Sequence, residues 1–176
     1  TSRPPVFRQT MMRMFLLYFG LGIVVLWWHV TLGRAFFTPD LRPNWVFLYL
    51  LPLLLHRPES WVLFYGAALG LALDGLSHLH TGVYAFSFLA TLVLARTTTN
   101  WFYSGNSLFL GIATAFFSLI SGLISLLLLN LLESELGWGA IFWSVTLPTS
   151  VLHGLLAPVV VWGLARLEHS LLEPAS

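Results

Sequence analysis

Long apolar stretches separated by short polar segments run through the whole chain. These stretches predict six membrane-spanning helices, at residues 14–37, 44–55, 60–76, 83–95, 108–132 and 141–165. The second stretch holds twelve residues, about 18 Å of helix against a hydrocarbon core of roughly 30 Å. We therefore expect a short or tilted span, kinked at Pro52 and dependent on its neighbours.

Composition agrees with a membrane protein. Of 176 residues, 57% are apolar and 9% are charged, against about 25% charged in a typical soluble domain. The whole chain, residues 1–176, is therefore predicted to be one integral membrane domain. The absence of cysteine excludes disulfides and thiolate metal sites. The net charge of +1 predicts no nucleic-acid partner.

The third predicted span carries a single acid, Asp74, and a charge within a membrane costs about 3 kcal/mol on insertion scales. Gly66 and Gly70 share its side of the helix, and small residues let another helix approach closely. We therefore expect Asp74 to face protein. Three roles are open for Asp74. It caps the following turn, which ends near Gly82, it anchors a partner helix, or it couples to a proton or ligand. We favour a structural or assembly role.

The fifth predicted span has two distinct faces. One face carries small residues, among them Ser118 and Gly122, and the opposite face carries bulky apolar side chains. The small face is expected to pack on protein and the bulky face on lipid. An interface between helices is favoured over a path for a substrate.

Two groups of residues invite a chemical interpretation. His78 and His80 follow Asp74 and could hold zinc with it, but no further His or Cys lies nearby, which favours ordinary interfacial histidines. Ser121 and His153 could form the serine–histidine dyad of a rhomboid-type protease. That pattern, however, requires glycine where this chain has Leu119. The sequence therefore predicts no catalytic residue, no metal and no cofactor.

The arginines predict the orientation in the membrane. With a cytoplasmic N-terminus, two arginines lie outside, Arg34 and Arg42, and six lie inside: Arg3, Arg8, Arg13, Arg57, Arg96 and Arg166. Because cytoplasmic loops carry the excess of positive charge, both termini are predicted to be cytoplasmic.

The chain resembles the bacterial rod shape-determining protein MreD family in three features. An arginine-bearing N-terminus leads into one span. The segment RPNWVFLYLLPLLLHRPES at residues 42–60 is similar to that family's proline-led apolar segment. The glycine-rich helix ends in Gly70-Leu71-Ala72-Leu73-Asp74, with Gly82 eight residues on. The specific likeness covers residues 42–96, and the last two spans match in hydrophobicity alone.

The resemblance implies a multi-pass protein of the bacterial inner membrane, within the peptidoglycan-synthesising elongation complex of rod-shaped cells. Its implied partners are MreC, the actin-like MreB filament, and the RodA glycosyltransferase with its class B penicillin-binding protein. The implied fold is a six-helix bundle like the substrate-binding subunits of energy-coupling-factor transporters. No catalytic residue carries over from the family.

We therefore expect a non-enzymatic scaffold that binds MreC through transmembrane helices and contacts membrane lipids. The residues expected at partner-binding or helix-packing positions are Gly66, Gly70, Asp74, Gly82, Ser118 and Gly122. The alternative is a membrane transport subunit that binds a small molecule or lipid. Such a subunit is expected to hold a closed polar cavity into which Asp74, His78 or His29 points.

Overall fold

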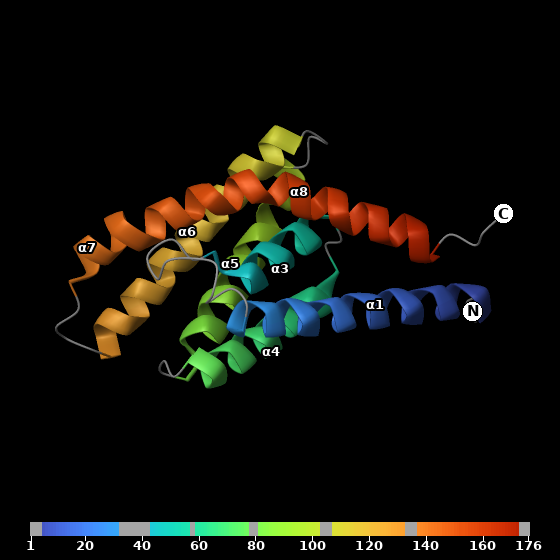
Figure 1. Ribbon diagram of the computed structural model, residues 1–176, viewed down its shortest axis with the longest axis horizontal. Helices are drawn as coiled ribbons and strands as arrows, with labels where there is room; N and C mark the ends of the chain where they lie inside the picture. The colour runs from blue at the N-terminus through green and yellow to red at the C-terminus, as the bar shows by residue number, and fades with distance from the viewer. Residues whose placement is uncertain are drawn as a thin grey trace.

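The computed structural model describes residues 5–31, 43–56, 59–77, 81–102, 107–132 and 137–172, and these segments form helices and turns only (Figure 1). The helices are α1 (Pro5–Val30), α3 (Trp45–His56), α4 (Ser60–Ser77), α5 (Val83–Phe102), α6 (Ser107–Leu132), α7 (Trp138–Ile141), the π-helical turn η2 (Phe142–Thr146) and α8 (Leu147–Leu172). The prediction of an all-helical chain is confirmed for these residues.

Four helical stretches are long and apolar enough to cross a membrane: Met12–Val30, Ser60–Ser77, Leu108–Leu132 and Trp138–Ser170. The apolar parts of α3 and α5, Trp45–Leu55 and Val83–Thr98, are shorter. Four of the six predicted spans therefore have the length of a crossing. Many large apolar side chains on the four long stretches are exposed, as a lipid environment requires.

Two helices continue where the sequence predicted a loop or a tail. The predicted loop from Arg96 is wrong in its first part, because α5 runs on to Phe102. The hydroxyls of Thr97 and Thr98 donate to the carbonyl oxygen of Leu94, at 2.8 and 2.9 Å. These polar side chains therefore find partners within the helix and do not end it. Likewise, α8 runs beyond residue 165, and α1 begins before residue 14.

A proline shapes the last span. The span contains Pro148, and the chain forms the π-helical turn Phe142–Thr146 just before this residue. The N–H of Leu147 bonds to the carbonyl of Phe142 there. Because proline offers no N–H for the regular ladder, the wider turn takes up the mismatch.

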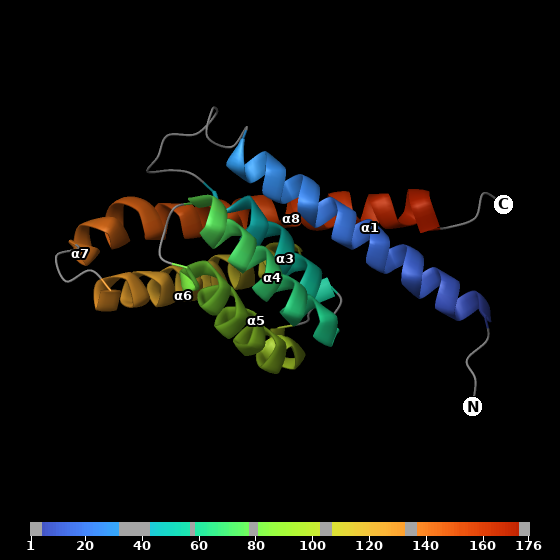
Figure 2. The same cartoon turned by 90° about the horizontal axis from the view of Figure 1, so that it is seen from below.

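The short helix α3 is the centre of the bundle. It contacts α1, α4, α5, α6 and α8 and lies between α4 and α8, with α1 across it (Figures 1 and 2). Its side chains are almost fully enclosed, among them Val46, Leu48, Leu50, Leu51 and Leu54. A helix of about 18 Å suffices here because its ends are held by protein. The expectation that it depends on its neighbours fits this position.

Tyrosine hydroxyls attach α1 to this centre. Tyr49 of α3 donates to the carbonyl of Tyr18 at 2.8 Å, and Tyr65 of α4 donates to the carbonyl of Phe19 at 2.9 Å. Gly22 leaves the space into which the Tyr65 hydroxyl reaches. The Tyr18 hydroxyl in turn donates to Glu168 of α8. The start of α1 and the end of α8 lie toward the same end of the molecule (Figures 1 and 2).

Candidate functional site

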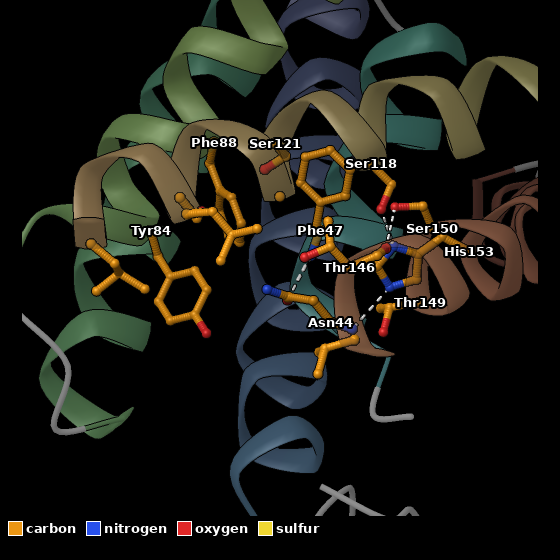
Figure 3. Close-up of a pocket in the computed structure, with 15 residues that line it drawn as sticks. Asn44, Phe47, Tyr84, Phe88, Ser118, Ser121, Thr146, Thr149, Ser150 and His153 are labelled. Atoms are coloured by element: carbon orange, nitrogen blue, oxygen red, sulfur yellow. Dashed lines mark hydrogen bonds between the residues drawn. The ribbon is translucent and has the colours of Figure 1, made fainter. Parts of the chain in front are cut away.

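A cavity of about 190 Å³ lies beside the first turn of α3, between α5, α6 and α8 (Figure 3). Tyr84 and Phe88 lie on one side of it, His153 and Ser118 lie on the other, and Phe47 lies between them. The described residues that line it include no charged side chain: Asn44, Phe47, Tyr84, Phe88, Ser118, Ser121, Gly122, Ser125, Leu126, Leu129, Val145, Thr146, Thr149, Ser150 and His153.

His153 ties three helices together at this cavity. Its side chain is 2% exposed, and its Nε2 accepts the backbone N–H of Asn44 at 2.9 Å. Its Nδ1 lies 2.5 Å from the Oγ of Ser118. Because Asn44 N–H is only a donor, Nε2 carries no proton, and the neutral ring therefore donates from Nδ1 to Ser118. Asn44 completes the tie by accepting the Phe47 N–H at 3.2 Å, which caps α3.

This proton arrangement is opposite to that of a catalytic dyad. A nucleophilic serine gives its proton to histidine, whereas Ser118 accepts one from it. The pairing of Ser121 with His153 that a protease would need is not formed, because both ring nitrogens have other partners. Ser118 and Ser121 lie three residues apart on one face of α6. Spacing alone therefore left open which serine meets the histidine.

One further hydroxyl at the cavity is buried without a partner among the residues described, and two more line the same space. The Oγ1 of Thr149 is buried without a hydrogen bond. Ser121 and Thr146, 6% and 9% exposed, line the same space. Ser150 differs, because its hydroxyl donates to the Thr146 carbonyl at 2.7 Å. The cavity thus offers free hydrogen-bonding capacity within an apolar bundle.

Asp74 lies outside this cavity and caps α5. Its carboxylate is 1% exposed and accepts the backbone N–H groups of Gly82, Tyr84 and Ala85 at 3.0, 2.8 and 3.1 Å. These are donors that the first turn of a helix leaves unpaired. Gly82 has φ +103°, a conformation that favours glycine. The geometry favours the structural interpretation of Asp74.

The predicted packing glycines meet the chain's own helices. A Cβ on Gly70 would lie 2.6 Å from the Cα of Ala85 in α5, and one on Gly66 would overlap Leu92. On α6, a Cβ at Gly122 would overlap Thr146. The small faces of α4 and α6 are therefore filled from within the chain, and binding of a partner by these residues stays a prediction.

The histidine predictions have different outcomes. His78 and His80 lie outside the described residues, so the structure does not place them. Within the described part of the chain, no three His, Asp or Glu side chains lie together as metal ligands would. His29 lies on α1 and does not line the cavity.

Comparison with known proteins identifies one family. Its sequence model, described as rod shape-determining protein MreD, matches residues 7–167. No curated protein and no solved structure matches the chain, so the expected likeness to energy-coupling-factor subunits has no support. The family description implies a role in determining rod shape. Since the match covers nearly the whole sequence, this chain belongs to the MreD family.

Proposed function

We propose that the protein is a non-enzymatic scaffold of the inner membrane, within the complex that synthesises peptidoglycan during cell elongation. There it binds MreC through transmembrane helices and helps to maintain the rod shape. The family match over residues 7–167 carries this proposal. MreB, RodA and its class B penicillin-binding protein are the further proposed partners.

The polar groups of the bundle support a structural role. Asp74 satisfies the start of α5, and His153 joins α3 to α6 and α8. Both act through bonds to neighbouring helices within the chain. Within the membrane, such bonds contribute only about 0.6–2 kcal/mol each. They therefore determine how the helices are arranged more than they drive the association of the helices.

The lipid-facing side of α1 is the surface we propose for MreC. It exposes an apolar strip that includes Leu16, Ile23, Val24 and Trp27, whose side chains are 50–61% exposed. Gly20 lies within this strip. Gly20 has open space above it. Since Gly66 and Gly70 already meet other helices of this chain, a partner needs a side that is not yet covered.

The distribution of described arginines supports a cytoplasmic position for both termini. Arg13 lies early in α1, Arg96 late in α5 and Arg166 late in α8. In an up-and-down bundle these three positions belong to the same end, as the positive-inside rule requires. The cavity, near the starts of α3 and α5, then belongs to the outer end.

Cross-linking tests the scaffold proposal, and the absence of cysteine removes any background. Single cysteines at Leu16, Ile23 or Val24 are expected to form disulfides with cysteines in the MreC transmembrane helix when both proteins are co-expressed. Leu50→Cys on the enclosed α3 is the matched control and is expected to form none. Failure of MreC to co-purify, or equal cross-linking of all positions, contradicts the proposal.

A small-ligand function is the second candidate, and the cavity favours it. For this function, the sequence analysis predicts a closed polar cavity into which Asp74, His78 or His29 points. Asp74 and His29 are placed elsewhere, and the cavity is lined by hydroxyls and aromatic rings instead. A different chemistry of ligand therefore has to be considered.

A further inference from the structure

We propose that the cavity beside α3 binds an uncharged, polyhydroxylated ring, such as a sugar unit. This inference is independent of the scaffold proposal, because it rests on the lining of the cavity and not on a partner surface. Three properties of that lining carry it: several hydroxyls, of which that of Thr149 is buried and unpaired, the aromatic rings of Tyr84 and Phe88, and a volume suited to one ring.

The hydroxyls set the hydrogen-bonding character of the ligand. Ser121, Thr146 and Thr149 line the same space, and the Oγ1 of Thr149 is buried without a hydrogen-bond partner among the described residues. A buried hydroxyl without a partner costs free energy. Because each hydroxyl can both donate and accept, a ligand with several hydroxyls can pair with Thr149 and bond to Ser121 and Thr146 as well.

The described lining carries no charged side chain, and this favours an uncharged ligand. A phosphate or carboxylate held in an apolar bundle needs arginine, lysine or several free N–H groups. The N–H groups of Asn44 and Phe47 at the start of α3 are already bonded, to His153 and to the Asn44 side chain. An uncharged ligand therefore suits the site better than an anion.

The aromatic wall and the volume set the shape of the ligand. Tyr84 and Phe88 lie across the cavity from the hydroxyl-bearing residues of α8 (Figure 3), and pockets of this mixed kind bind a ligand through both faces. The volume of about 190 Å³ exceeds the roughly 150 Å³ cavity that holds a benzene ring. This volume is enough for a single six-membered ring.

Equilibrium binding to the full chain in phosphatidylcholine vesicles tests the proposal. The two probes are methyl glucoside, which is soluble, and monoglucosyl diacylglycerol, whose sugar is presented by the membrane. Saturable binding of both points to a free sugar, and binding of the lipid alone points to a lipid headgroup. Either result is expected from the proposal, and saturable binding of neither overturns it.

Variants then locate the site. Combining Ser121→Ala with Thr146→Val keeps the shapes but removes two hydroxyls, and about tenfold weaker binding or more is expected. Ser144→Ala is the matched control, because this exposed hydroxyl of η2 bonds to the Ala140 carbonyl. Wild-type affinity in the double variant overturns the proposal.

A third variant separates binding from folding. Thr149→Val replaces an unpaired hydroxyl by a methyl group, so the melting temperature is expected to stay or rise while affinity falls. Loss of both together overturns the proposal, because it makes Thr149 a structural residue. Cross-linking to MreC is expected to be unchanged in all these variants. A failure of the sugar-binding proposal can therefore be told apart from a failure of the scaffold proposal.

Discussion

Asp74 shows how a bundle in the membrane can bury an acid by pairing it with backbone N–H groups. Its two carboxylate oxygens receive three backbone N–H groups from the start of α5. The positive end of the helix dipole adds to the attraction. The carboxylate therefore takes the place of a local N-cap side chain, supplied from the preceding helix.

Removal of this cap is expected to destabilise the protein. Asp74→Ala leaves the N–H groups of Gly82, Tyr84 and Ala85 unpaired, at a cost of about 3 kcal/mol. Asp74→Asn retains one acceptor and is expected to cost less. Ser77→Ala, which removes a weak 3.3 Å bond to the Asp74 carbonyl, is the control. Thermal unfolding in lipid nanodiscs gives the order, and equal melting temperatures for all three contradict the cap.

The sequence predicted some residue roles and missed others. Asp74 followed by a glycine near a turn was enough to suggest a cap, since both features are local. The partner of His153 was missed, because a choice between Ser118 and Ser121 depends on the rotation of α6 about its axis. The bond from the Asn44 N–H to His153 was missed as well, because every residue except proline has a backbone N–H and the sequence does not show which of them binds a side chain.

At the scale of elements, one of the contacts that attach α1 depends on a glycine. Gly22 faces the Tyr65 hydroxyl, which bonds to α1 carbonyls, whereas Gly20 faces open space. These two residues, only two positions apart, therefore form a natural pair for comparison.

Gly22→Ala is expected to push Tyr65 away and lower stability by about 1–2 kcal/mol. Gly20→Ala is expected to have no such effect. Because Tyr65→Phe already removes the hydroxyl, Gly22→Ala should cost less in that background. Melting temperatures of the four proteins test this coupling. Additive effects of Gly22→Ala and Tyr65→Phe argue against this contact.

Helix ends were the weakest part of the element predictions. The apolar pattern stops at Arg96, but hydroxyls that bond back to the helix let α5 continue as far as Phe102. Before Pro148, the chain widens its helix into a π turn that the apolar pattern does not reveal. Both differences arise from backbone hydrogen bonds, which hydropathy does not measure.

At the scale of the whole molecule, hydropathy was sufficient for the helical class and for four long spans, but not for the cavity. Its lining comes from residues 44–47, 84–88, 118–129 and 145–153, which are far apart in the sequence. Each set is unremarkable alone, since serine and threonine are common on packing faces. Only the packing of α3, α5, α6 and α8 around one point assembles their hydroxyls.

The enclosure of α3 also bears on how the chain enters the bilayer during synthesis. A segment of twelve residues is too short to settle alone in hydrocarbon, where its ends would lack hydrogen-bond partners. We expect it to wait at the membrane surface until later helices emerge from the ribosome and surround it. In a stalled nascent chain cut after His56 and extended by a polar linker long enough to fill the ribosomal exit tunnel, a cysteine at Leu51 should react with a water-soluble thiol reagent, and it should be protected once synthesis is complete. Protection already at the stalled stage would mean that this segment inserts unaided.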